Sequence, residues 1–328
     1  MTAFPAPLNP TVDAIEAVDR PKARPVRMSL ADIGKPCERS IWYGFRWANR
    51  DQCRPARWNR AGDIAMAVKP LLIKWLTDTG VSVETVDLAT GNYHAVHALD
   101  GHFFSPIDGI ATGVKEAPKT KHLVVTAALN TQAYRRVVKV GLAEAKPDHL
   151  TKAQFAMHLL GLTRAIYVCC DRNDGSVHAE RIKYDAAHAM AIAARLERIK
   201  FVQRAPVRIA DKPDHYECRN CAAHSICHGS EFPPRNCRTC LHSGCVQNGE
   251  WFCVRHNQEL TTEDQLAGCP NHLYLPELVP AEQIDADERA ETVTYRLPDG
   301  REWVDGGDRQ TSSPQPLEAL ESADWSAS

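Results

Sequence analysis

Residues 101–110 read GHFFSPIDGI, and residues 121–130 read KHLVVTAALN. The second stretch predicts a buried strand over 122–129, because its centre LVVTAAL is uncharged and rich in aliphatic and β-branched side chains. The first stretch predicts another strand, which carries one carboxylate, Asp108. A helix-like run, TQAYRRV, follows from residue 131. This succession of elements predicts an α/β domain in which Asp108 lies near the buried strand.

Helices and strands follow one another in mixed order over residues 29–203. We expect helices at 29–48, 62–79, 132–143, 148–161 and 186–203, and further strands at 81–87, 94–98, 102–112, 164–171 and 177–184. Pro70 lies inside the second helix and predicts a bend there. Because the order is not a repeating βαβ array, the pattern predicts an α/β fold with a mixed sheet flanked by helices.

The chain is expected to divide into five segments. These are a flexible leader over 1–28, an α/β domain over 29–230, a Cys-rich, zinc-ribbon-like module over 231–280, an acidic linker and β-hairpin over 281–304, and a disordered tail over 305–328. The leader is rich in proline, and the hairpin turns on Asp299-Gly300. The tail consists mainly of Gly, Ser, Pro and acidic residues, which do not build a core.

Charge is unevenly distributed along the 328 residues, although the formal net charge is only −2. Residues 20–60 hold eleven Lys and Arg against three acidic residues, whereas residues 277–328 hold thirteen acidic residues against four Arg. The basic segment suits a polyanion, and the acidic one suits solubility, masking of the basic lobe or a basic partner. No apolar run approaches a membrane helix and no signal peptide is recognisable, so we expect a cytoplasmic protein without membrane association.

Twelve cysteines in a reducing compartment indicate metal sites more readily than disulfides. The first group is CRNCAAHSIC at 218–227, in which Cys218, Cys221 and Cys227 have the spacing C-x2-C-x5-C. This group needs a fourth ligand, and Cys37 is a plausible distant one. A set of four thiolates fits an iron–sulfur cluster or zinc equally well by its chemistry.

The second group of cysteines lies within residues 237–272. Cys237, Cys240, Cys253 and Cys269 have the two-knuckle spacing of a zinc ribbon. His256 and His272 are alternative ligands, and Cys245 is a poorer one. We therefore expect one bound zinc, and the spacing alone does not select its four ligands from these residues. By contrast, Cys169 and Cys170 lie on a predicted strand and are expected to be buried thiols without a role.

The arrangement of Cys37 before an aromatic helix, with C-x2-C-x5-C about 180 residues later, resembles the iron–sulfur subgroup of PD-(D/E)XK nucleases. This subgroup includes CRISPR-associated exonucleases and the B subunit of the AddAB helicase–nuclease. The resemblance implies a restriction-endonuclease-like core in which Cys37, Cys218, Cys221 and Cys227 hold a [4Fe–4S] cluster. That cluster would staple the N-terminal helix to the end of the nuclease domain. The Cys-rich module also resembles the C-terminal part of phage and prophage members.

The resemblance extends to DGIATGVKEAPKTKHLVVTAALNTQAY, where phage members carry an aspartate, a glutamate and a lysine. Asp108 matches the metal-binding aspartate, but the glutamate falls on Val125 and the lysine on Ala127. The two acids would hold Mg²⁺ or Mn²⁺, and the lysine would stabilise developing charge. Valine and alanine do neither. On the flanking helices, Asp63 is a weak substitute for the Glu or His that phage members carry near 63–67, and Gln154 alone remains of their Q-x-Q-x-Y pattern.

These changes lead to the hypothesis of a catalytically inactive PD-(D/E)XK protein of phage or mobile-element type that binds nucleic acid, DNA rather than RNA, or a protein partner. One alternative is an active Mg²⁺-dependent DNA exonuclease with displaced residues, for which the charged loop at 115–121 is the source. Another is a protein inhibitor or assembly factor without a DNA role. The residues expected to contact nucleic acid are Arg39, Arg46, Arg50, Arg54, Arg135, Arg136 and Lys139. Trp42 and Trp47, beside them, are expected in the core.

Overall fold

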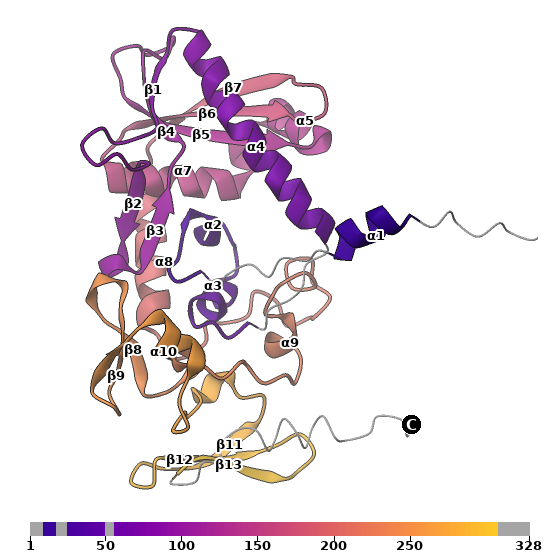
Figure 1. Cartoon of the computed structure of the whole chain (residues 1–328), viewed down its shortest axis with the longest axis vertical. Helices are drawn as coiled ribbons and strands as arrows, with labels where there is room; N and C mark the ends of the chain where they lie inside the picture. The colour runs from indigo at the N-terminus through magenta and orange to yellow at the C-terminus, as the bar shows by residue number, and fades with distance from the viewer. Residues whose placement is uncertain (1–8, 18–24, 50–55, 308–328) are drawn as a thin grey trace, which may run out of the picture.

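A five-stranded mixed sheet lies in the upper part of the molecule as seen in Figure 1, in the computed structural model, which describes residues 9–17, 25–49 and 56–307. Its strand order is β1-β4-β5-β6-β7, and only β5 and β6 run parallel. The strands are β1 (Ser82–Glu84), β4 (Gly109–Thr112), β5 (His122–Leu129), β6 (Arg164–Asp171) and β7 (Val177–Lys183). The mixed α/β architecture and the buried strand predicted at 122–129 are therefore confirmed.

Helices cover both faces of this sheet, which is why β5 can be uncharged along its length. On one face, Val68, Leu72 and Leu76 of α4 (Ala56–Asp78) belong to the same apolar cluster as Val124. On the other face, Phe155 of α7 (Pro147–Leu160) shares a larger cluster with Leu123, Ala127 and Leu129 of β5. Helix α5 (Thr131–Val140) follows β5, and the short α6 (Leu142–Ala145) follows α5.

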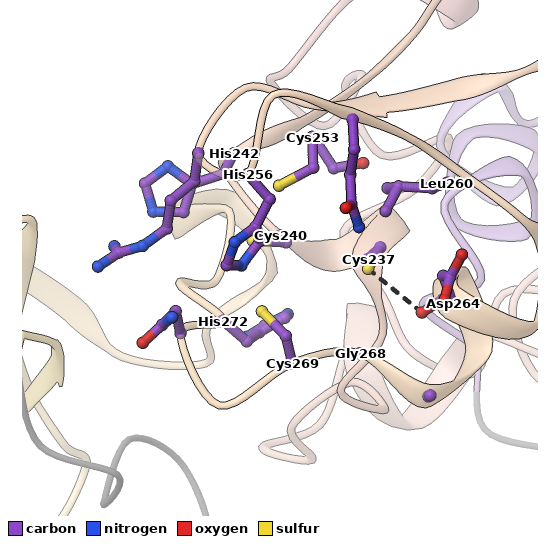
Figure 2. A pocket seen from close by; sticks show the side chains of 15 residues that line it. Cys237, Cys240, His242, Cys253, His256, Leu260, Asp264, Gly268, Cys269 and His272 are labelled. Carbon is purple, nitrogen blue, oxygen red and sulfur yellow. Dashed lines mark hydrogen bonds between the residues drawn. The ribbon is translucent and has the colours of Figure 1, made fainter.

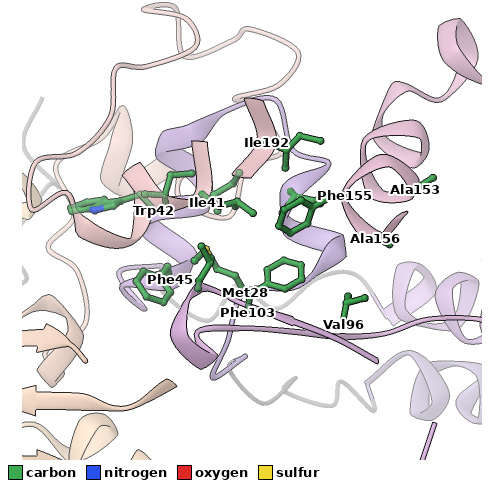
Figure 3. Close-up of a cluster of buried hydrophobic side chains, with 14 of the residues drawn as sticks. Met28, Ile41, Trp42, Phe45, Val96, Phe103, Ala153, Phe155, Ala156 and Ile192 are labelled. Carbon is green, nitrogen blue, oxygen red and sulfur yellow. The ribbon is translucent and has the colours of Figure 1, made fainter. Parts of the chain in front are cut away.

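The larger cluster also joins the N-terminal helices to α8 (Ala186–Phe201) and to a separate hairpin of β2 (Ala95–Ala98) and β3 (Phe103–Pro106) (Figure 3). These helices are α2 (Leu30–Ile33) and α3 (Glu38–Phe45). Trp42 and Trp47 are buried, as predicted for core residues. One correction concerns the leader, because Pro10–Ala17 form a helix, α1.

The single strand predicted over 102–112 is two strands in different sheets. β3 ends at Pro106 and pairs with β2, whereas β4 begins at Gly109 and pairs with β1 and β5. Gly109 makes this change of sheet possible, since its φ of 148° is rare for other residues. A Cβ there would also lie 2.9 Å from the Glu84 carbonyl oxygen. Asp108 consequently lies at the break between the two sheets.

The Cys-rich segment contains a second small sheet of order β10-β9-β8, near the lower end of α8 in Figure 1. Its elements are α9 (His224–Cys227), η2 (Cys237–Thr239), β8 (Ser243–Cys245), η3 (Gln247–Gly249), β9 (Trp251–Cys253), β10 (Gln258–Leu260) and α10 (Thr262–Ala267). This segment abuts the short turn η1 (Leu99–Gly101) between β2 and β3. A Cβ on Gly101 would lie 2.5 Å from the Asn248 carbonyl carbon, and one on Gly249 would lie 2.5 Å from the Gly101 oxygen. The two backbones thus meet where only glycine fits.

The C-terminal sheet has three strands, β11 (Glu282–Asp287), β12 (Thr292–Arg296) and β13 (Glu302–Gly306), and follows the turn η4 (Pro276–Leu278). The predicted hairpin at 292–304 is present as β12 and β13. The acidic segment expected to be a linker forms the third strand, β11, instead. Buried Asp305 joins this sheet to the Cys-rich segment, because its Oδ2 accepts a hydrogen bond from the Tyr274 amide at 2.7 Å. No helix within the described residues is long and apolar enough to cross a membrane.

Candidate functional site

A cleft of about 590 Å³ lies beside Asp108, between α4, α7 and β5, and is called the Asp108 cleft below. Its polar lining residues include Lys69 of α4, Lys146, and His149 and Lys152 of α7. Val125 and Ala127 line it as well. Among the described residues that line the cleft, Asp108 is the only carboxylate. The charged lining is therefore three lysines against one aspartate.

Both carboxylate oxygens of Asp108 have partners within the protein. Oδ1 accepts a hydrogen bond from the Lys69 ammonium at 2.7 Å. Oδ2 accepts two from Thr126, one from the backbone amide at 2.7 Å and one from the hydroxyl at 2.8 Å. Thr126 is buried, whereas Lys69 and Asp108 are each partly exposed. An ammonium and two neutral donors thus occupy three of the roughly four lone-pair sites of this carboxylate.

The partner of Asp108 on β5 is Thr126, and not either of the two positions at which the resemblance placed the catalytic pair. Side chains alternate along a strand, so Thr126 faces the α4 side with Val124, while Val125 and Ala127 belong to the cluster on the α7 side. Lys69 was not identified from the sequence. It lies on α4 six residues after Asp63, and a lysine at that position does not indicate a metal ligand.

His149 is held neutral within the cleft. Burial lowers the pKa of His149 to about 4, and the neighbouring lysines lower it further, against the opposing effect of Asp148. Its Nδ1 lies 3.0 Å from the Tyr167 hydroxyl. The positive charge of the cleft at neutral pH is consequently carried by the lysines.

The other residues carried over from the resemblance lie outside the cleft. Gln154 is buried in α7, where its amide bonds to the Lys183 carbonyl and the Asp185 amide, each at 2.8 Å. Asp63 is exposed on α4. Lys115, Glu116, Lys119 and Lys121 form an exposed charged loop. Gln154 therefore positions α7 against β7, and the charged loop supplies no second carboxylate to the cleft lining.

The first cysteine group comes together from two distant parts of the chain. Cys37 is the N-cap residue of α3, and the other three lie around α9. Burial raises the pKa of the Cys218 thiol, and the neighbouring Cys37, Cys227 and Cys221 raise it further because thiolates repel one another. Cys221 donates to the Ser40 hydroxyl at 3.4 Å. A set of four sulfur donors at one place suits a cluster of iron and sulfide or a zinc ion.

The second cysteine group surrounds a separate cavity of about 210 Å³ (Figure 2). The four predicted cysteines, Cys237, Cys240, Cys253 and Cys269, line it together with His256 and His272. His242 lines it as well and was not identified from the sequence, where it stands outside the C-x2-C and C-x2-H spacings. Burial raises the pKa of the Cys237 thiol to about 12, with smaller contributions from the neighbouring Cys240, Cys269 and Cys253.

Across the described part of the chain, no three His, Cys, Asp or Glu side chains stand in a geometry ready for a metal ion. Two of the thiols donate hydrogen bonds elsewhere: Cys237 to the Asp264 carbonyl and Cys221 to the Ser40 hydroxyl, both at 3.4 Å. In both groups the cysteines lie in one region of the fold, but their side chains are not oriented toward a common point. A thiol that donates a hydrogen bond must lose its proton and turn before it binds a metal.

The predicted nucleic-acid residues that the structure describes fall into three classes. Arg135, Arg136 and Lys139 are exposed on α5. Arg39 is half-buried, and its guanidinium donates to the Tyr43 hydroxyl and the Pro206 carbonyl. Arg46 is 2 % exposed, and burial lowers its pKa to about 10. Arg46 is thus a core residue and not part of a binding surface, because its ring contacts with Trp42 and Trp251 enclose it. Arg50 and Arg54 lie outside the described residues.

Comparison with known proteins gives no family model and no curated protein that matches the chain. Several solved structures are similar to it at low identity. LHK-Exo in complex with dAMP is 16% identical with a TM-score of 0.38, and the match covers 54% of this chain and 87% of that one. The alkaline exonuclease LHK-Exo from Laribacter hongkongensis is 15% identical with a TM-score of 0.37, covering 57% and 90%. SSO0001 is 12% identical with a TM-score of 0.36, covering 66% and 93%. TM-scores of this size carry no argument about activity.

Proposed function

We propose that this chain is a PD-(D/E)XK-like protein in which an internal ion pair has replaced the metal centre, and that it binds nucleic acid without cutting it. The observation that carries the proposal is the set of contacts made by Asp108. Its two oxygens are taken by Lys69 and Thr126, at 2.7–2.8 Å. A magnesium site requires carboxylate or phosphate oxygens that are open to the ion. Here the ammonium of Lys69 provides the positive charge instead.

The same cleft suits a phosphodiester. Three lysines, Lys69, Lys146 and Lys152, face one carboxylate in its lining, and the neutral His149 adds donor or acceptor capacity without charge. Lysine binds phosphate as a point charge and needs no metal. The exposed basic residues of α5 (Arg135, Arg136 and Lys139) extend the positive surface beyond the carboxyl end of β5. Binding should therefore depend on salt and not on divalent cations.

The four thiols of the first cysteine group are proposed to hold a [4Fe–4S] cluster, with a structural zinc as the alternative. Cys37 would attach the start of α3 to the loop that contains Cys218, Cys221 and Cys227. Such a group, when bound, supplies a rigid covalent link between segments about 180 residues apart. The proposed role is structural, since the Asp108 cleft is built from other elements.

A protein partner is the second candidate, and the acidic C-terminal sheet is the observation that favours it. Glu282, Asp285, Asp287 and Glu288 are all exposed on β11 and the turn after it. A surface of this kind attracts a basic protein and repels nucleic acid. Under this alternative the chain acts as an inhibitor or assembly factor, and the Asp108 cleft has no ligand.

Fluorescence anisotropy with single- and double-stranded DNA, in the presence of EDTA, separates these candidates. We expect salt-sensitive binding that EDTA leaves unchanged. Lys146→Glu with Lys152→Glu should weaken it at least about tenfold, whereas Lys119→Glu with Lys121→Glu, the matched pair on the exposed loop, should have a much smaller effect. Asp108→Asn should strengthen binding, because it removes a negative charge and keeps an acceptor for Thr126. Equal losses from both lysine pairs would place the DNA-binding surface outside the Asp108 cleft, and no binding at all would favour the protein partner.

A further inference from the structure

The cavity in the Cys-rich segment is enclosed by three separate pieces of chain (Figure 2). Cys237 and Cys240 come from the η2 turn, Cys253 ends β9, and Cys269 follows α10. Cys237, Cys240 and Cys253 are buried, and Cys269 is half-buried. The antiparallel pairing of β8 with β9 places Ser243 opposite Cys253, which brings the η2 turn close to the end of β9. Donors from distant positions thus share one enclosed volume.

The structure narrows the set of donors. Cys245 lies elsewhere, since its thiol contacts the Lys200 carbonyl at 3.5 Å and it does not line the cavity. His272 is committed to the η2 turn, because its Nε2 lies 3.1 Å from the Thr239 hydroxyl and its ring packs edge-on against Tyr274. His242 and His256 remain as competing ligands; His242 lies just before β8, and His256 lies in the turn between β9 and β10. The four cysteines are the sulfur donors that line the cavity, and the Cys237 thiol has one hydrogen bond to exchange, to the Asp264 carbonyl at 3.4 Å.

We infer that Cys237, Cys240, Cys253 and Cys269 bind one Zn²⁺, and that the ion fixes the η2 turn which holds the N-terminal segment 25–48 in place. On binding, each thiol releases one proton to solvent and one Zn–S bond forms per sulfur, so four protons leave for one ion. Cys237 exchanges its hydrogen bond to the Asp264 carbonyl for the ion. The resulting negative site lies beside Arg255, which also lines the cavity.

The residue between the first two ligands connects the η2 turn to the N-terminal segment 25–48. Arg238 is fully buried, and its guanidinium donates to the Phe45 carbonyl at 3.1 Å and the Val26 carbonyl at 2.9 Å. Asn236, just before the turn, donates to the Trp47 carbonyl at 3.1 Å. The η2 turn therefore carries the groups that bind the N-terminal segment on one side and two of the ligands on the other. An ion that orders the turn also orders that contact.

The first test measures metal on the full chain by native mass spectrometry and elemental analysis. Wild-type protein should hold one zinc that Cys253→Ser and Cys269→Ser both lose, while His256→Ala and Cys245→Ser keep it. Cys218→Ser, in the other thiol group, should keep it too and so separates the two sites. A zinc-free wild-type protein overturns the site, and zinc lost in His256→Ala but kept in Cys269→Ser overturns the four-sulfur set.

The second test needs no variant, so a failure of variants to fold does not affect it. Hydrogen exchange of the wild-type chain is compared before and after removal of zinc by a chelator. Amides in 25–48 and 236–240 should lose protection together, and β6 serves as an internal reference that should not change. Loss confined to the cavity residues, with 25–48 still protected, would overturn the coupling to the N-terminal segment.

Discussion

The guanidinium carbon of Arg238 lies 3.7 Å from the centroid of the Trp47 ring, so the two side chains stack inside the protein. Burial lowers the pKa of Arg238 to about 9, and the neighbouring Arg46 lowers it further, yet the group still carries its charge at neutral pH. Aromatic faces and backbone carbonyls provide the negative partial charge around it. One side chain of the Cys-rich segment thus organises the contact with the N-terminal helices.

Arg238→Ala should lower the free energy of unfolding by about 3 kcal/mol or more. The change removes the donor of the buried Phe45 and Gln265 oxygens and of the Val26 carbonyl, and the loss at a buried oxygen costs about 1–3 kcal/mol. Urea denaturation measures the effect. Arg296→Ala, on an exposed ion pair with Glu282, is the matched control and should cost less than about 1 kcal/mol. Similar losses for the two variants would contradict the importance of burial here.

The protein should leave the ends of single- and double-stranded DNA intact in Mg²⁺ or Mn²⁺. Val125 and Ala127 cannot bind a metal or stabilise developing charge, and Asp108 is occupied by Lys69 and Thr126. Gel analysis after prolonged incubation should show no shortened product. Degradation that stops in the Asp108→Ala variant would instead establish a working metal-dependent nuclease with displaced residues.

Nucleic-acid affinity should fall steeply with salt, and α5 should account for part of that dependence. Replacing Arg135 and Arg136 by glutamate should weaken binding to all sequences alike and reduce the slope of log affinity against log salt by about 2. Arg289→Glu, on the exposed turn of the acidic C-terminal sheet, is a single-site control expected to have little effect. An unchanged slope in the α5 variant would place the binding surface elsewhere.

Protein purified without oxygen should be brown, and its colour should depend on Cys37. Cys37→Ser removes one of four proposed cluster ligands, so the visible absorbance should decrease and the protein should lose stability. Cys170→Ser, on buried β6, should keep the colour. A colourless wild-type protein that contains only zinc would rule out the iron assignment and leave the fold unaffected.

Stability should depend on pH through Asp305. Burial raises the pKa of Asp305 from 3.8 to about 6, although the hydrogen bond from the Tyr274 amide lowers it. Because the folded pKa lies above the unfolded one, the contribution of this group to stability is fully present below about pH 4. It is lost as the pH rises through about 6.

Asp305→Asn should remove this dependence and raise the free energy of unfolding at pH 7 by about 3 kcal/mol, since one pKa unit corresponds to about 1.4 kcal/mol. Denaturation between pH 4 and 7 measures the difference from wild type. The pKa of Asp299 is lowered by its bonds to Arg301, so Asp299→Asn should not alter the profile within this window. A constant difference across the window would contradict the titration of Asp305.

The strands of the sheet were predictable because their residues are either uncharged or alternate between apolar and polar side chains. β5 and β6 are bounded by charged or polar turns, and their periodicity is unambiguous. The break between β3 and β4 was not predicted, because FFSPIDGIAT is continuously strand-like and the change of sheet depends on the φ of Gly109. The sequence of β11 predicts a linker and not a strand, because its side chains are mostly exposed and show no alternation of apolar and polar residues.

The cleft was harder to predict than the sheet. Asp108 and the cysteines have spacings that indicate chemistry, so the sequence was enough to select them. Lys69 and Arg238 belong to no such spacing. A lysine on a helix and an arginine between two cysteines usually face solvent, so nothing in the sequence selects them. Lys69 contacts Asp108, which is 39 positions away in the sequence, and Arg238 contacts Val26, which is 212 positions away. Arg46 was misassigned for the same reason, since burial of an arginine depends on its neighbours in space.

The close approach of Gly101 and Gly249 limits how this protein can have diverged. Neither backbone leaves room for a methyl group, so an alanine at either position would force the Cys-rich module away from the turn between β2 and β3. Genetic exchange of the Cys-rich module alone would place its η3 turn against a β2–β3 turn with a different shape. The module and the hairpin should therefore be inherited as one unit, and a homologue that lacks one of the two glycines should carry the module in a different place.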